Sequence, residues 1–172
     1  MTMESHMPVR TIDIELSIMY HFNFRQNLIV PNITNMVGIV PFETDILVLT
    51  KNNRAYGFEI KVSKADLKAD FKKPQHKQDT KAGFERYYGK FKYFYYAVPF
   101  NLKEAALQII PEFCGLICIE KIKHDTYTRK RFEVSREPKQ LFDYRWTEAE
   151  KYEVARLGAM RQYNLMQAIA NK

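Results

Sequence analysis

The chain has 172 residues, of which 46% are hydrophobic, and it carries a formal net charge of +7. This length favours one domain spanning residues 1–172, and the hydrophobic fraction is sufficient for a full core. No apolar run reaches the length of a transmembrane helix, so the sequence excludes a helical membrane span and predicts no membrane partner.

The charge and the cysteines indicate a partner class and a compartment. An excess of basic residues favours polyanionic partners without identifying one. Cys114 and Cys118 have three residues between them, which is not the spacing of a redox or zinc motif. Buried free thiols are therefore predicted, and a reducing cytoplasm is the compartment that fits them.

The first predicted elements are a helix and a short strand. Residues 11–23 show apolar side chains at helical spacing, and Glu15 lies within this stretch. Residues 28–30 and 33–40 are short apolar runs separated by Pro31. We expect one of them to be a strand and the other a loop.

Residues 43–50 and 55–62 have the composition of two β-strands, and charged residues interrupt both. Glu59 and Lys61 project from one face because side chains alternate along a strand. Asp45 lies on the neighbouring strand. Such groups are costly to bury unpaired, and a divalent cation such as Mg²⁺ would explain them. The alternative is a structural ion pair between Glu59 and Lys61.

The loop between these strands decides whether the two carboxylates meet. A three-residue loop, Lys51 to Asn53, places Asp45 opposite Glu59. A two-residue turn places Asp45 opposite Ile60 instead. Asparagine tolerates the backbone of both turns, so both registers remain open.

A basic helix follows directly. Ser63 is the predicted cap of a helix that ends before Pro74. Lysines at four-residue spacing share one face of such a helix. The adjoining carboxylates favour a phosphate-binding surface, with the following residues as candidates: Lys64, Lys68, Lys72, Lys73 and Lys77.

The remaining sequence alternates helices and strands. Aromatic residues between 92 and 98 are interpreted as sheet core, and residues 121–143 as a loop or an edge hairpin. The further expected elements are helices over 75–88, 102–110 and 147–170 and a strand over 115–119. This order predicts one α/β domain.

The residues at this point resemble the PD-(D/E)XK nuclease superfamily. Its motif is an acid on the second core strand and acid-x-Lys on the third, which Asp45 and Glu59-Ile60-Lys61 match. The resemblance implies a restriction-endonuclease-like core, in which a central mixed β-sheet is flanked by helices. An acid in the first helix is a common fourth member, and Glu15 occupies a suitable place.

A longer stretch is similar to the MmcB-like branch of small bacterial proteins linked to DNA repair. Residues 59–70, Glu-Ile-Lys-Val-Ser-Lys-Ala-Asp-Leu-Lys-Ala-Asp, look like the strand and helix of that branch. Residues 93–99 and 111–117 resemble its next two strands. The resemblance covers about residues 40–120 and implies a role in DNA repair, recombination or mobile-element biology.

The resemblance also implies roles for the individual residues. Asp45 and Glu59 would hold Mg²⁺ or Mn²⁺, with the Ile60 carbonyl as an additional ligand. Lys61 would orient the attacking water, and it could act as a base only if its pKa were lowered. Glu15 would contribute to a second metal. The expected activity is metal-dependent hydrolysis of phosphodiester bonds in DNA.

Several alternatives stay open. The chain could be an inactive nuclease-fold protein that only binds nucleic acid, or a basic α/β interaction module. The sequence does not distinguish DNA from RNA, and it leaves the oligomeric state open, a homodimer included. Among the individual residues, Asp70 is expected to face solvent or pair with a lysine. His76 is expected either to touch phosphate or to be a surface residue.

Overall fold

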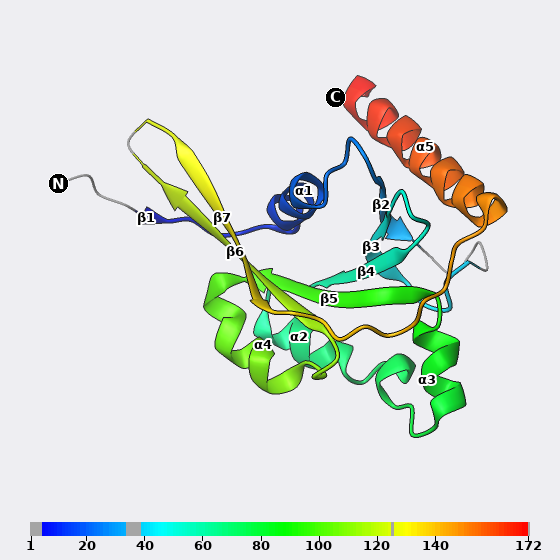
Figure 1. The fold of residues 1–172 in the computed structure, drawn as a ribbon. Helices are drawn as coiled ribbons and strands as arrows, with labels where there is room; N and C mark the ends of the chain where they lie inside the picture. The colour runs from blue at the N-terminus through cyan, green and yellow to red at the C-terminus, as the bar shows by residue number, and fades with distance from the viewer. Residues whose placement is uncertain (1–4, 34–38, 125, 172) are drawn as a thin grey trace.

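The computed structural model describes residues 5–33, 39–124 and 126–171. Helices and strands alternate along the chain, with two short 3-10 turns, η2 and η3 (Figure 1). The elements are β1 (Ser5–His6), α1 (Thr11–His21), β2 (Leu28–Ile33), β3 (Thr44–Leu49), β4 (Ala55–Ile60), α2 (Lys64–Asp70), η2 (Pro74–His76), α3 (Lys81–Tyr88), β5 (Phe91–Pro99), η3 (Phe100–Leu102), α4 (Lys103–Ile109), β6 (Gly115–Lys123), β7 (Thr128–Arg136) and α5 (Glu148–Ala170).

The strands form one mixed sheet of seven strands. Strands β2, β3 and β4 pair antiparallel, and β4, β5 and β6 pair parallel. Strand β7 is antiparallel to β6, and β1 pairs with the far end of β6. The α/β class with a central mixed sheet flanked by helices is therefore confirmed.

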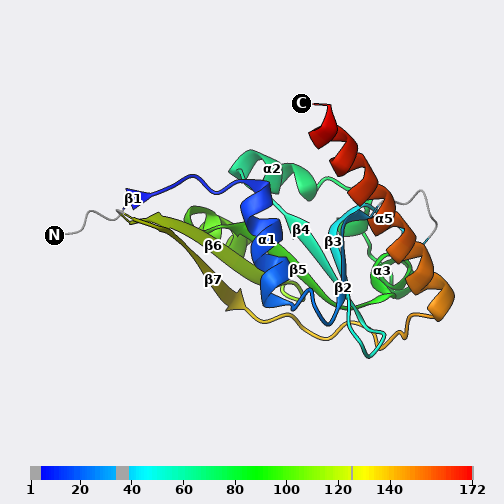
Figure 2. The same cartoon turned by 90° about the horizontal axis from the view of Figure 1, so that it is seen from above.

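Helices cover both faces of this sheet. Figure 1 shows α2, α3 and α4 on one side and α1 on the other. Alternation along each strand produces two cores: Leu47 and Ala55 belong to the one with α2, α3 and α4, and Ile46 and Phe58 to the one under α1. Figure 2 shows α1 lying across its face and α5 beside the edge strand β2.

The β3–β4 hairpin has the longer of the two loops considered. Leu49 pairs with Ala55, and the Thr50 N–H donates to the Arg54 carbonyl over 2.9 Å. This leaves three loop residues, of which Asn53 adopts the left-handed backbone with φ 61°. The register predicted for a three-residue loop is confirmed.

Several element boundaries differ from the prediction. The strand of the first apolar run continues through Pro31 to Ile33, which an edge strand tolerates because one side of its backbone needs no partner. The remainder of the predicted 33–40 run lies partly outside the described residues. Helix α2 is capped by Ser63 as predicted but ends at Asp70. The helix predicted over 75–88 is a 3-10 turn, a loop and the shorter α3.

Residues beyond the parallel strands form an edge hairpin, one of the two alternatives for 121–143. It is longer than expected, because β6 continues to Lys123 and pairs with β7 over most of its length. Cys114 and Cys118 are buried free thiols, as predicted. Within the described residues, no helix combines the length and apolarity needed to cross a membrane.

Candidate functional site

The hairpin brings the two predicted carboxylates together at one end of the sheet. Ile46 pairs with Phe58, and the same register continued by one residue places Asp45 opposite Glu59. The Ile60 N–H donates to Asp45 Oδ2 over 2.6 Å, which fixes this carboxylate against β4. Both acids belong to the face of the sheet that α2 covers.

Lys61 lies on the same face, as alternation from Glu59 requires. Its Nζ is 2.6 Å from Glu59 Oε1, and its backbone N–H donates to the Ala97 carbonyl of β5. Glu59 is 3% exposed and Lys61 is 6% exposed. This buried ion pair is therefore held by two neighbouring strands.

A second acid and a second lysine complete the charged cluster. Lys73 Nζ lies 3.0 Å from Glu59 Oε1 and 2.6 Å from Asp70 Oδ1. Lys61 Nζ is 3.4 Å from the same Asp70 oxygen. Two ammonium groups thus alternate with two carboxylates, and Lys73 is the more exposed of the two cations.

Two further side chains contact the Asp70 carboxylate. The Tyr96 hydroxyl donates to Asp70 Oδ2 over 2.6 Å, and His76 Nε2 lies 3.0 Å from the same oxygen. Tyr96 is in the sheet core as predicted, whereas the surface position considered for His76 is wrong because its side chain is 5% exposed. Asp70 pairs with lysines, which was one of the two expectations for it.

Burial sets the protonation of the two opposed acids. It raises the pKa of Glu59 to about 7, and the nearby Asp45 carboxylate adds to this rise against the effect of the Lys61 ammonium. Burial also raises the pKa of Asp45, although the Ile60 N–H and the two lysines act in the opposite direction. Both acids would therefore gain from an additional cation.

The lysines and Asp70 are shifted toward their charged forms. Burial lowers the pKa of Lys61, but the Glu59, Asp70 and Asp45 carboxylates outweigh it and the net shift is upward. Burial raises the pKa of Asp70, but hydrogen bonds from His76, Lys73 and Tyr96 hold it well below its usual range. Lys61 is therefore a persistent cation here, and the condition for its acting as a base is not met in the metal-free protein.

Glu15 lies on α1, on the other face of the sheet, and is half-buried. It lines a cavity together with Arg161 and Leu165 of α5. Burial raises its pKa, and the charge of Asp45 adds to this rise. Among the described residues Glu15 makes no hydrogen bond to Asp45 or Glu59, so the structure does not bring it into the acid cluster.

The predicted phosphate-binding lysines divide into two groups. All five are exposed, but only Lys73 directs its ammonium group into the acid cluster. Lys64 and Lys68 lie on α2, but the helical spacing does not extend to Lys72 because the helix has ended at Asp70. The exposed lysines that lie outside the acid cluster are Lys64, Lys68, Lys72 and Lys77.

The carboxylate oxygens that the lysines leave open suit a hard cation such as Mg²⁺. Both ammonium groups contact Oε1 of Glu59, and among the described residues Glu59 Oε2 and Asp45 Oδ1 have no hydrogen-bond partner. The described residues contain no group of three or more His, Cys, Asp or Glu side chains placed to hold a metal ion. Carboxylate oxygens are ligands that suit Mg²⁺, which is commonly bound through one or two carboxylates, water and substrate phosphate.

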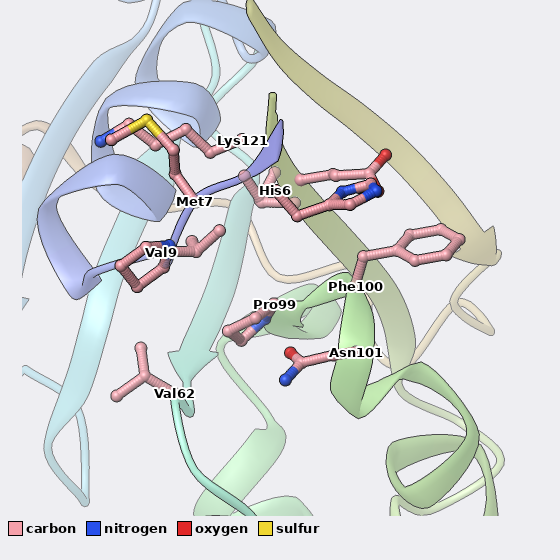
Figure 3. A pocket seen from close by; sticks show the side chains of 11 residues that line it. His6, Met7, Val9, Val62, Pro99, Phe100, Asn101 and Lys121 are labelled. Carbon is pink, nitrogen blue, oxygen red and sulfur yellow. The ribbon is translucent and has the colours of Figure 1, made fainter. Parts of the chain in front are cut away.

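A cavity of about 390 Å³ opens near the carboxyl ends of β4 and β5. Figure 3 shows Val62, Pro99 and Phe100 among its lining side chains. Val62 alternates with Lys61, and Ile119 in the lining belongs to the core under α1. The cavity therefore lies on the α1 side of the sheet, on the opposite face from the acid cluster.

Comparisons with known proteins bear on the fold alone. No protein-family model matches the sequence, and no curated protein matches it. The chain is similar in structure to the SPO1766 protein of unknown function from Silicibacter pomeroyi, with a TM-score of 0.54 and 18% sequence identity. The match covers 91% of this chain and 88% of that chain.

Proposed function

We propose that this chain is a Mg²⁺-dependent nuclease of the PD-(D/E)XK type, related to the MmcB-like branch, that hydrolyses phosphodiester bonds in DNA. The observation that carries this proposal is the placement of Asp45 opposite Glu59, with Lys61 on the same buried face. The resemblance around residues 59–70 supports a role in DNA repair, recombination or mobile-element biology.

In this proposal the two acids form the metal site. Asp45 and Glu59 would hold Mg²⁺ or Mn²⁺ through the carboxylate oxygens that the lysines leave open, with the Ile60 carbonyl as an additional ligand. The bound cation would polarise a phosphoryl oxygen and lower the pKa of its water. Glu15, whose charge interacts with that of Asp45, would take part through water.

The lysines would act on charge rather than as bases. Lys61 keeps its proton because three carboxylates surround it, so it would donate hydrogen bonds to the attacking water and to the phosphate. Lys73 is 44% exposed at its side chain and contacts the same Glu59 oxygen, which places a second cation where substrate could reach it. When substrate and metal bind, the two lysine ammonium groups would exchange their contacts with Glu59 for contacts with the phosphate.

A cleavage assay tests this proposal. Labelled single- and double-stranded DNA is incubated with the protein in Mg²⁺, Mn²⁺ or EDTA, and metal affinity is measured by calorimetry. Asp45→Asn and Glu59→Gln should each lower cleavage by at least about 100-fold, because even residues that only support a metal ligand contribute 10–100-fold. Asp66→Asn, an exposed acid on α2, is the matched control and should cleave normally.

The other outcomes distinguish the alternatives. Wild-type cleavage by Asp45→Asn would rule out this metal site. A wild-type protein that binds DNA and metal but never cuts would be an inactive nuclease-fold binding protein. A protein that binds neither would be an interaction module whose acids are structural ion pairs, an arrangement that the metal-free contacts of Glu59 with Lys61 and Lys73 would stabilise.

A further inference from the structure

Exposed apolar side chains gather on two helices of this molecule, α1 with the turn that follows it and α5. Of thirteen large hydrophobic residues exposed in the described part of the chain, ten lie between residues 12 and 24 or between 152 and 169. These ten are Ile12, Leu16, Tyr20, Phe24, Tyr152, Met160, Tyr163, Leu165, Met166 and Ile169. Such a concentration marks an interaction surface, whereas single exposed hydrophobic residues are ordinary.

The second half of α5 has the composition of an interface. Residues 148–156 carry three acidic and two basic side chains, as a solvated helix does, but residues 157–170 contain a single charge, Arg161. Tyrosine, methionine and leucine supply most of the bulk there. Depletion of charge with enrichment of aromatic residues and methionine distinguishes the centre of protein interfaces from other surface.

Beyond Leu157, which packs against the core, the same half of α5 has little support from its own chain. Val154 is the one buried residue of this 23-residue helix, and Gly158 packs against Val30 of β2. Beyond this contact Arg161 donates to the Asn32 carbonyl, and the last turns extend away from the sheet (Figure 1). Isolated helical turns are marginal in water, so these turns need packing that the chain itself does not provide.

The exposed faces of α1 and α5 are continuous across the edge strand β2. A cavity of about 500 Å³ is lined by Ile12, Leu16 and Met19 on the α1 side and by Leu165 on α5, and one charged residue of each helix, Glu15 and Arg161, also lines it. A second cavity of about 530 Å³ continues along α1 toward Phe24. The two helices therefore present one apolar surface, which we call the α1–α5 surface, defined by the ten residues above without Tyr152.

We propose that the α1–α5 surface binds a second copy of this chain in a two-fold homodimer. A self-complementary interface is the common form of association between identical chains. The acid and the base that line the cavity, Glu15 and Arg161, balance each other, so the surface carries no excess charge that would favour a polyanion over an identical partner. The nine side chains that define the surface are each between 45% and 81% exposed. At about 200 Å² for a large side chain they present roughly 1,000 Å², which is comparable with the roughly 800 Å² that each partner buries in a standard interface.

Sedimentation velocity tests this proposal, which does not depend on nuclease activity. At micromolar concentration the wild-type protein should have an apparent mass of twice the 20.4 kDa monomer. The double substitution Leu165→Glu and Met166→Glu should weaken association by at least about 100-fold, because it places charge at the centre of an apolar contact. Leu16→Glu tests the α1 side independently.

Matched controls keep the result unambiguous. Tyr127→Glu places the same charge on an exposed aromatic residue in the β6–β7 turn and should leave the dimer intact. Both altered α5 residues are more than half exposed, so circular dichroism of the variants should show the folded sheet. A wild-type monomer at all concentrations up to about 100 µM would overturn the proposal, as would a dimer that survives both the α5 and the α1 substitutions.

Discussion

The Asp70 carboxylate contacts four side chains of the charged cluster. Oxygen Oδ1 faces two lysines, and Oδ2 accepts from a tyrosine and faces a histidine. An acid in this position compensates the second ammonium group, because Glu59 alone cannot balance both lysines. Asp70 therefore keeps Lys61 and Lys73 charged and in place without occupying the oxygens proposed to hold metal.

Asp70→Asn should destabilise the fold by about 3 kcal/mol, since removing one partner of a buried ion pair leaves the others uncompensated. Urea denaturation at pH 7 measures this change, with Asp66→Asn as the control because that side chain is exposed on the same helix. Asp66→Asn should change the free energy of unfolding by less than about 0.5 kcal/mol. Equal losses in the two variants would show that Asp70 has no special role.

The sequence predicts the opposed acids but not their support. Strand alternation places Glu59 and Lys61 on one face, and an odd loop length, one of the two that the sequence allows, adds Asp45. Asp70 was expected at the surface or with a lysine, yet it lies three residues after the buried Leu67 and so shares its inward face. That spacing was the available signal. The contact with His76 depends on a 3-10 turn that no periodicity indicates.

At the scale of elements, the β3–β4 hairpin and α2 determine the site together. The hairpin sets which residues oppose each other, and α2 follows Lys61 after a short connection capped by Ser63. The helix turns its apolar side and Asp70 to the sheet and leaves its lysines outside. The acid cluster and the exposed basic surface are therefore two faces of one continuous segment.

Replacing Lys64 and Lys68 together by alanine should weaken DNA binding in the proposed complex. Each lysine that contacts a phosphate adds about one to the slope of log affinity against log salt, so the slope should fall by up to about two. Fluorescence anisotropy at several salt concentrations gives this slope. Lys51→Ala with Lys139→Ala removes two exposed lysines outside α2 and should leave the slope closer to wild type. If both double substitutions lowered the slope equally, the lysines of α2 would contribute only through the overall charge of the protein.

Element types are predicted better than their ends. Hydrophobic alternation and periodicity identify the strands and most helices, because burial of one face dictates the pattern. The predicted helix over 75–88 fails at its start, where η2 and a loop precede the Thr80 cap of α3. The sequence does not distinguish a loop from a hairpin over residues 121–143, because β7 and the end of β6 are rich in charge and are stabilised by pairing with each other.

At the scale of the whole molecule, the buried acids make stability depend on pH. The folded-state pKa of Glu59, about 7, lies above its ordinary value of 4.5. Between these values the folded protein binds more protons than the unfolded chain, so stability falls as pH rises. A shift of this size corresponds to up to about 3 kcal/mol. Burial acts in the same direction on Asp45.

Glu59→Gln should therefore reduce the loss of stability of the metal-free protein between pH 5 and pH 7.5. Urea denaturation in EDTA at the two pH values measures it, and Glu112→Gln, whose side chain is 89% exposed, is the control. Millimolar Mg²⁺ should restore stability to wild type at the higher pH and not to Glu59→Gln, because a ligand that binds only the folded state stabilises it. An identical pH dependence in wild type and Glu59→Gln would contradict the shifted protonation.

The single tryptophan is a fluorescent reporter that lies between the β3–β4 loop and the start of β5. Trp146 is 1% exposed, its backbone N–H donates to the Asn53 carbonyl in the β3–β4 loop, and its indole N–H donates to the Lys90 carbonyl before β5. Its emission thus senses the loop that sets the hairpin register and the strand that carries Tyr96. A red shift of the Trp146 emission during unfolding would report when the β3–β4 loop separates from Trp146. That loop sets the register in which Asp45 and Glu59 oppose each other.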